Sequence, residues 1–198
     1  MTAPTHRPDD FRAQAAPREL GRLGMRLLLL ALSMLFAASL TGYLVVRAGA
    51  SAWPPPGMPG FPKGLWFSTV LILLASATVQ WALSGIRRGD QRGLRYGLIL
   101  TTGLGVAFLA SQTINWFALV AEHLTPRVNL YGFTFYLLTG LHAAHVVGGL
   151  IPLAITTRKA IRGDYTPQFH PGVENVAIYW HFLDAVWMVL FVILFLAG

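Results

Sequence analysis

The chain contains five separate runs of apolar residues, each about 18 residues or longer, and this feature restricts its possible folds more than any other. The runs lie at about residues 23–46, 64–86, 94–121, 130–156 and 174–197. In hydrocarbon every backbone polar group needs an internal partner, so apolar runs of this length form membrane-spanning helices. The sequence therefore predicts an all-α integral membrane protein with a five-helix transmembrane bundle.

The segments between these runs are short and carry residues that end helices. Prolines and a glycine fill the first connection at 53–57, and charged residues with a glycine fill the second at 87–90. With 55% hydrophobic and 12% charged residues, the chain is too apolar for an ordinary soluble domain. We expect one transmembrane domain over residues 21–198, preceded by a disordered cytoplasmic arm at 1–20.

The basic residues are distributed unevenly between the two sides of the predicted bundle. Of the 15 arginine and lysine residues, all but Arg47, Lys63 and Arg127 lie in the N-terminal arm, the first helix entry, or the second and fourth connections. The positive-inside rule then places the N-terminus in the cytoplasm and the C-terminus in the periplasm. Because topology accounts for the net charge of +7, the sequence predicts no nucleic-acid partner.

Two histidines, His142 and His145, are three residues apart in the fourth predicted helix and share one of its faces. Gly140, Ala144 and Gly148 form a row of small residues on another face, where they would let a neighbouring helix approach closely. In hydrocarbon the histidine face needs polar partners, so we expect the fourth helix to lie inside the bundle.

Polar residues also recur on the fifth and third predicted helices. Glu174, His181 and Asp184 share a face of the fifth, and Gln112 and Asn115 are three residues apart in the third. An acidic residue at the middle of a spanning helix costs about 2.5–3.5 kcal/mol, so Asp184 should face a partner or water. Together with the two histidines, these residues predict one structural network of hydrogen bonds inside the bundle.

A metal site and a proton relay are the alternatives to a structural network. A haem needs axial ligands on opposite sides of its ring, and a di-iron site needs several carboxylates with Glu-x-x-His pairs; neither pattern is present. His142, His145 and His181 could still form a three-histidine site in a self-contained metal enzyme. A relay would need ionisable groups that continue through the first two helices, which carry almost none. A small transporter has no support from paired broken helices or an inverted repeat. We therefore assign no catalytic, metal-binding or cofactor-binding residue.

Two stretches of the chain have a distinctive order of residues: FYLLTGLHAAHV at 135–146, followed by Gly149, and YWHFLDAVW at 179–187. They resemble subunit III of the haem-copper oxidases, the cytochrome c oxidase subunit 3 family, and the second is close to the family signature YWHFVDxVW. The resemblance extends from about residue 21 to the end of the chain. Many relatives have seven helices, and the pair missing here is N-terminal, so the chain is similar to a short bacterial form.

The resemblance implies a cofactor-free subunit of a respiratory haem-copper oxidase in the bacterial cytoplasmic membrane. In that family the subunit packs beside the catalytic subunit I, holds phospholipid in a cleft and supports sustained proton uptake during aerobic electron transport. Haem and copper are then expected in the partner subunits I and II. The close alternative is an accessory subunit of a quinol oxidase or a nitric oxide reductase. Where the family usually has a glutamate in its LGMWxFLxSE stretch, this chain has Leu32, so a carboxylate role on the first helix does not carry over.

The distribution of basic residues predicts the result of a topology experiment. A reporter fused after Gly198 should give a periplasmic signal, and one inserted near Gly89 should give a cytoplasmic signal. Alkaline phosphatase and a fluorescent protein, each placed at both sites, would measure this. The reverse pattern would contradict the orientation, and a cytoplasmic signal at both sites would contradict an odd number of spans.

Overall fold

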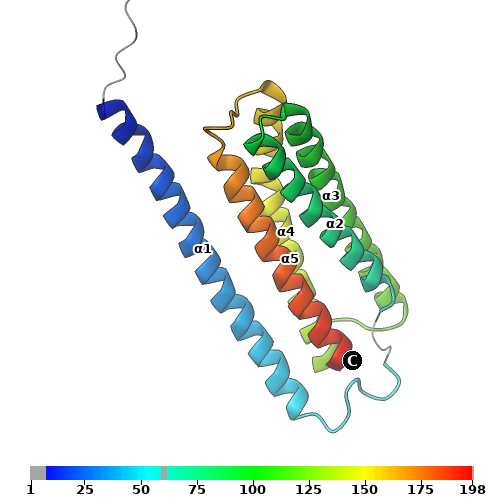
Figure 1. Ribbon diagram of the computed structural model, residues 1–198. Coiled ribbons are helices and arrows are strands. Elements are labelled where there is room, and N and C mark those ends of the chain that lie inside the picture. Colours follow the sequence, from blue (N-terminus) through cyan, green and yellow to red (C-terminus); the bar gives the residue numbers. More distant parts are fainter. Residues whose placement is uncertain (1–7, 59–61, 198) are drawn as a thin grey trace, which may run out of the picture.

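The computed structural model describes residues 8–58 and 62–197, which form five α-helices (Figure 1). These are α1 (Pro8–Ala48), α2 (Gly64–Arg87), α3 (Gln91–Ala121), α4 (Leu130–Arg162) and α5 (Pro171–Ala197). Each contains a stretch long and apolar enough to cross a membrane. Within the described residues, extended pairing is limited to one isolated bridge between Thr166 and Phe169. The predicted all-α fold with five transmembrane helices is confirmed.

The first helix is longer than the sequence analysis predicts. It begins at Pro8 rather than near residue 23, so residues 8–20 are helical where a disordered arm is expected. Proline suits the first position of a helix, because its fixed φ is already helical and the N–H it lacks would have no partner there. Residues 1–7 of the expected arm lie outside the described residues.

The fourth helix also continues past its predicted end near residue 156 and stops at Arg162. Lys159 and Arg162 lie in its last turn, where basic side chains complement the negative end of the helix dipole. Gly163 follows with a φ of 83°, the left-handed conformation that commonly terminates a helix. The basic residues in the last turn therefore allow α4 to continue beyond its apolar run.

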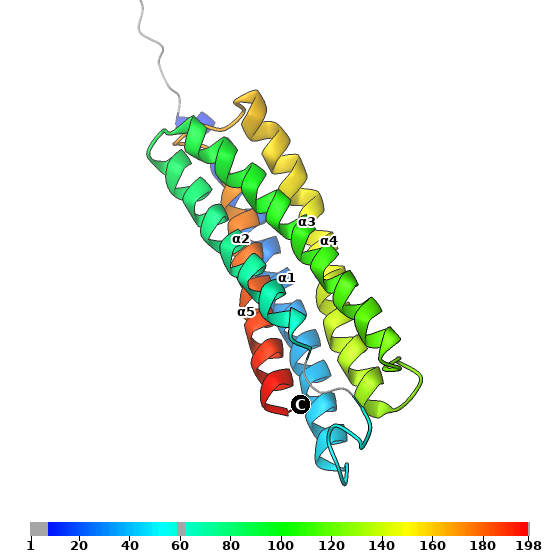
Figure 2. The same ribbon diagram turned by 90° about the vertical axis from the view of Figure 1, so that its right-hand side faces the viewer.

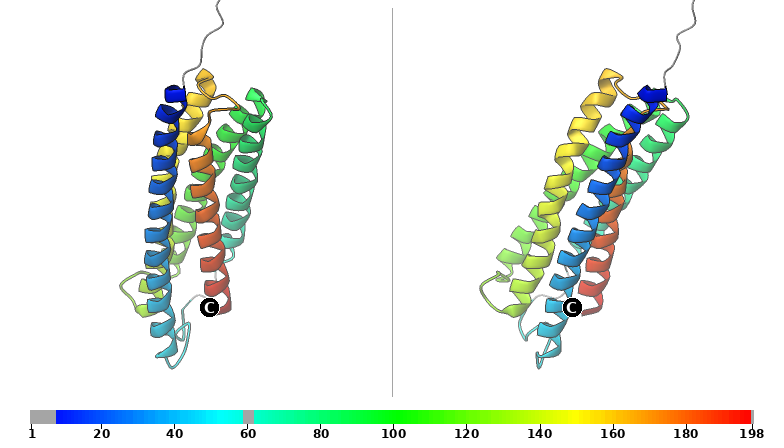
Figure 3. Two further views of the ribbon diagram at one scale, coloured as in Figure 1. Left: turned by 60° about the vertical axis from the view of Figure 1, so that its left-hand side comes forward. Right: turned by 90° about the vertical axis from the view of Figure 1, so that its left-hand side faces the viewer.

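Helices α2 to α5 form a closed ring in which each packs against the next and α5 packs against α2. Helix α1 lies outside this ring, against α5 and α4 (Figures 1 and 3). The α2–α3 and α4–α5 connections lie at the same end of the bundle as the start of α1, and the C-terminus lies at the opposite end (Figures 1 and 2). We call the first of these the basic end, because Arg22, Arg87 and Arg162 lie there.

The largest buried side chains lie inside the ring. Trp180 and Trp187 of α5 and Phe108 of α3 are almost completely shielded. The rings of Phe108 and Trp187 meet edge to face with their centroids 5.0 Å apart. The indole Nε1 of Trp187 donates a hydrogen bond of 2.9 Å to Thr69 Oγ1 of α2. One tryptophan therefore connects three helices, and its polar atom has a partner inside the bundle.

Helices α2 and α3 approach each other closely at Gly97. A Cβ at this position would lie 2.7 Å from the Cβ of Ala82 and 2.9 Å from its backbone Cα and N. The connection between these helices is short, and Asp90 caps α3 by accepting hydrogen bonds from the backbone N–H groups of Arg92 at 3.0 Å and Gly93 at 2.9 Å. The hairpin is therefore held tightly, and position 97 has no room for a side chain.

We expect Gly97→Ala to lower the free energy of unfolding by about 1–3 kcal/mol, because the added methyl group must push the backbones of α2 and α3 apart. Gly103→Ala, on the same helix, is the matched control, since a Cβ there meets no atom within 4 Å. The control should be neutral or slightly stabilising, because alanine favours helix more than glycine does. Unfolding in mixed micelles, followed by circular dichroism, would measure both. Equal destabilisation by the two changes would contradict the close contact.

Candidate functional site

His142 lies in an aromatic cage at the centre of the molecule. Its side chain is fully buried, and its ring lies 5.0 Å from that of Trp187, 5.7 Å from that of Phe108 and 6.3 Å from that of Phe36, measured between centroids. Neither ring nitrogen has a hydrogen-bond partner among the described residues. Helices α1, α3 and α5 therefore enclose a histidine of α4 by packing rather than by hydrogen bonding.

His145 lies near the next turn of α4, where α1 covers it. Its Nδ1 is hydrogen-bonded to the backbone carbonyl of Leu141 at 2.7 Å, and its ring centroid is 5.2 Å from that of Phe36. The hydroxyl of Tyr179 donates to the backbone carbonyl of His145 at 3.1 Å. The two histidines thus share a helix face, as predicted, but their nitrogens do not converge on a common point.

In the polar row of α5, His181 finds its partners on α2, and the sequence analysis did not identify them. His181 bonds through Nδ1 to Ser76 Oγ at 2.7 Å and through Nε2 to Gln80 Oε1 at 3.1 Å. The Ser76 hydroxyl also lies beside the carboxylate of Asp184, whose Oδ1 has no partner in the described part of the chain. Ser76 and Gln80 are four residues apart in an apolar run, and this spacing was the available signal for them.

The polar residues of α3 form a different group. The Asn115 amide donates to Ser68 Oγ of α2 at 3.2 Å, and Ser68 in turn bonds to Ser111 at 2.9 Å. Gln112 is buried, and neither atom of its amide has a partner within the described residues. Serines 68 and 111 were also missed from the sequence, because a hydroxyl inside an apolar run is weak evidence of a particular contact.

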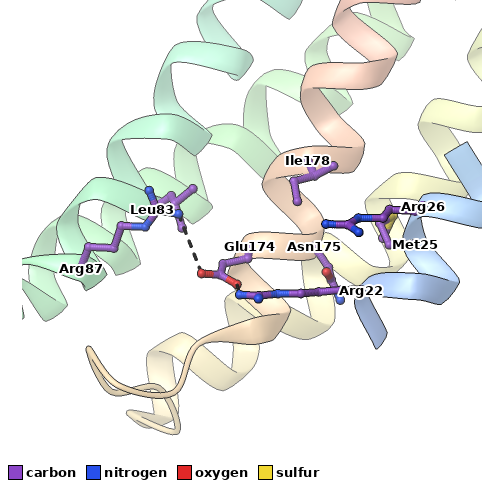
Figure 4. A pocket seen from close by; sticks show the side chains of 8 residues that line it. All are labelled: Arg22, Met25, Arg26, Leu83, Arg87, Glu174, Asn175 and Ile178. Atoms are coloured by element: carbon purple, nitrogen blue, oxygen red, sulfur yellow. Dashed lines mark hydrogen bonds and ion pairs between the residues drawn. The ribbon is translucent and has the colours of Figure 1, made fainter. Parts of the chain in front are cut away.

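Glu174 lies at the basic end and joins three parts of the fold (Figure 4). Its carboxylate is 3.0 Å from Arg22 of α1, 3.8 Å from Arg87 of α2 and 3.5 Å from Nε2 of His170. The two arginine side chains are 58% and 55% exposed, so each pair contributes little by itself, within about 1 kcal/mol. The group nevertheless marks the point where α1, α2 and α5 meet.

The seven polar residues expected to form one network are therefore divided among separate local groups. Among the described residues, no hydrogen bond joins any two of them. The physical reason is that hydroxyl and amide groups of α2 and the helix's own backbone carbonyls supply nearer partners. His181 and Asn115 each bond to side chains of α2 alone, Glu174 pairs with both α1 and α2, and His142 is enclosed by aromatic rings.

The small-residue row of α4 faces outward. A Cβ at Gly140 or at Gly148 would meet nothing within 4 Å, and Ala144 is exposed. The close approach inside the molecule occurs instead at Gly149, where a Cβ would lie 2.6 Å from the Tyr179 ring. The row expected to receive a neighbouring helix of this chain therefore receives none among the described residues.

A groove with a cavity of about 440 Å³ runs between α1, α4 and α5 towards the basic end. Its walls are mainly apolar, with Leu28 and Ile155 among them, and Lys159 and Tyr165 line it near its polar end. Burial raises the pKa of Tyr165, which lies in the α4–α5 connection, above its ordinary value. Tyr165 therefore stays a neutral hydroxyl at physiological pH, and Lys159 supplies the positive charge.

Clusters of three or more His, Cys, Asp or Glu side chains that could hold a metal ion are absent from residues 20–58 and 62–196, whose side chains the structure describes. The five long apolar helices, with polar side chains that form contacts between them, define a multi-pass membrane protein. The chain belongs to the cytochrome c oxidase subunit III family, whose model matches residues 15–198.

Curated relatives agree with this assignment over most of the chain. A protein named cytochrome c oxidase subunit 3 from Synechocystis sp. is 36% identical over 194 residues, covering 97% of this chain and 82% of the relative. The protein of the same name from Thermostichus vulcanus is 31% identical over 196 residues, covering 96% and 90%. That from Marchantia polymorpha is 40% identical over 155 residues, covering 77% and 57%. The resemblance to subunit III of the haem-copper oxidases, a non-catalytic subunit, is confirmed.

Leu32 departs from the family pattern at a buried position of α1. Its side chain is 9% exposed, and Phe36, one turn later, contacts the rings of both His142 and His145. The face of α1 that meets α4 is therefore apolar where the resemblance would place a carboxylate. No acidic residue lies in the α1 span from Leu20 to Ala48, so α1 offers His142 no acidic partner.

The unpartnered state of His142 predicts that a leucine can replace it. We expect His142→Leu to change the free energy of unfolding by less than about 1 kcal/mol or to raise it, because it removes two buried nitrogens that have no partners. His142→Ala should cost about 2–4 kcal/mol, because it leaves a cavity between the three aromatic rings. Detergent unfolding of the two variants would measure the difference. A large loss with leucine would contradict the cage and show that the ring nitrogens have partners.

Proposed function

We propose that the chain is subunit III of a bacterial cytochrome c oxidase and lies in the cytoplasmic membrane beside the catalytic subunit I and subunit II. The observation that carries the proposal concerns residues 135–146 and 179–187, the two stretches that resemble the family. Their side chains pack inside the bundle rather than forming a catalytic site. His142 lies in the aromatic cage, and Trp180 and Trp187 fill the interior of the ring. The function of the chain is then to stabilise the complex and sustain proton uptake, while haem and copper belong to the partner subunits.

The outward row Gly140, Ala144 and Gly148 supports a direct contact with a partner subunit. A spanning helix gains little from apolar surface alone in lipid, so close packing against small residues is one of the main sources of attraction between helices. Within the described residues, a Cβ at Gly140 would meet nothing within 4 Å and Ala144 is exposed, whereas Gly148 also lines the groove between α1, α4 and α5. A transmembrane helix of a partner subunit is the occupant we propose.

The orientation we propose places the basic end in the cytoplasm. The start of α1 and the α2–α3 and α4–α5 connections share this end, so their basic residues fall on one side of the membrane (Figure 1). Arg47 and Lys63 lie at the other end, which would face the periplasm. The positive-inside rule supports this assignment.

We also propose that a phospholipid occupies the groove between α1, α4 and α5. Its apolar walls suit an acyl chain, and Lys159 lies near the polar end, where a headgroup phosphate would be. The groove opens along the membrane-spanning part of the bundle, so a lipid could enter it sideways from the bilayer.

A variant on the outward row tests the proposed function. We expect Gly140→Leu to weaken retention of this chain in the purified oxidase by about tenfold, because over-packing at a helix contact costs about 1–3 kcal/mol. Gly103→Leu is the control, since both glycines have nothing within 4 Å of a Cβ. The complex would be purified through a tag on the catalytic subunit, and this chain would be quantified against haem.

The same preparation separates stabilising from catalytic roles. The oxidase that has lost this chain should keep its haem spectrum and its initial rate, and its activity should decay faster over many turnovers. Equal retention of the two leucine variants would show that the row is not a subunit contact. Loss of the initial rate with the chain fully retained would contradict a structural role.

A further inference from the structure

A second cavity, of about 280 Å³, lies between α1, α2 and α5 at the basic end (Figure 4). Arg22 and Arg26 of α1 and Arg87 of α2 line it, together with the apolar side chains of Leu83 and Ile178. This cavity shares Met25 and Asn175 with the wall of the groove between α1, α4 and α5, but the groove has Lys159 rather than arginines at its polar end. The proposed function makes no use of it.

The charges around this second cavity are unbalanced. Among the described residues, Glu174 is the one carboxylate in its wall, and it pairs with Arg22 at 3.0 Å and with Arg87 at 3.8 Å. Arg26 has no ion pair or hydrogen bond from its side chain within the described residues, and it is exposed. Three guanidinium groups therefore face a single carboxylate, which leaves the cavity with an excess of two positive charges.

The position of Arg26 along α1 indicates the source of an anion that would balance the positive charge. It lies one helical turn beyond Arg22, about 6 Å further along α1, where the continuous apolar run begins. A charged side chain inside a span needs a partner or must reach the interface. Lipid phosphates lie at this interface, and arginine binds phosphate through paired N–H donors. Leu83 and Ile178 provide apolar surface beside the arginines, as an acyl chain requires.

We propose that this cavity binds the headgroup of an anionic phospholipid, with its phosphate between Arg26 and Arg22 and an acyl chain along Leu83 and Ile178. Glu174 need not be displaced, because each guanidinium carries five N–H donors and the pair with Arg22 uses one nitrogen. The lipid then bridges α1 to α2, two helices that share no direct backbone packing in the described part of the chain. Its phosphate site, at Arg22 and Arg26, differs from the one at Lys159 that we propose for the groove, although Met25 and Asn175 line both cavities.

The experiment measures lipid retention by the full chain. Wild type and variants are purified in detergent, stripped of lipid, and titrated with phosphatidylglycerol, phosphatidylcholine or sodium phosphate, and native mass spectrometry reads the bound species. We expect wild type to bind phosphatidylglycerol more tightly than phosphatidylcholine. Arg26→Gln should weaken phosphatidylglycerol binding by about fivefold, since one basic residue near an anionic surface contributes a factor of that order.

Two control variants decide the location. Arg92→Gln removes the same charge from an exposed side chain at the same end, outside the cavity, and should leave binding unchanged. Lys159→Gln alters only the groove, so the loss it causes should add to that of Arg26→Gln. Circular dichroism should show all variants folded, because Arg26 makes no bond within the described chain that its replacement would break.

Three outcomes would overturn the proposal. Unchanged phosphatidylglycerol binding in Arg26→Gln would show that this cavity does not bind the lipid. If Lys159→Gln still reduced binding, the groove would be the lipid site of the two. An equal loss in Arg92→Gln would show a general effect of charge. Displacement of the lipid by sodium phosphate would identify a site for free phosphate rather than for a phospholipid.

Discussion

Because hydrocarbon supplies no hydrogen-bond donor or acceptor, each polar side chain within the spans must find a partner in the chain or be enclosed. His181 takes the first course, with Ser76 and Gln80, and so does Trp187, with Thr69. His142 takes the second, among three aromatic rings. The order of the helices in the ring follows from these contacts, since α2 carries the hydroxyl and amide groups that α5 requires.

The fold could be predicted from the sequence because length and hydropathy alone define spans in a bilayer. The contacts could not. Helical periodicity places His142 and His145 on one face, but it does not say which neighbour that face meets. Gly148 and Gly149 show the same limit, because adjacent residues point about 100° apart, and here the second is packed under Tyr179 while the first faces outward. The four-residue spacing of Ser76 and Gln80 was the one signal for these partners, and it is weak because polar residues at this spacing do not identify the helix they contact.

The structure explains how a subunit can belong to a redox complex without redox chemistry of its own. Its polar groups are dispersed into local contacts, and the face of α1 against α4 is apolar at Leu32 and Phe36. Three parts of the surface remain available for contacts with the rest of a complex: the small-residue row of α4, the groove beside α1, and the arginines of the basic end. Each can recognise a helix or a lipid by shape and charge, which is the kind of contribution that a stabilising subunit makes.

The position of α1 outside the ring has a consequence for the order of biosynthesis. Ribosomes make α1 first, yet the helices it packs against, α4 and α5, are the last two to be made. Until then α1 has only lipid around it. Its most apolar stretch has the highest mean hydropathy of the five, 2.1, and only 17% of that stretch is buried in the finished fold. The contacts of α1 with α4 and α5 can form only after those two helices have been made, and the high hydropathy of α1 suits a helix that is in lipid before then.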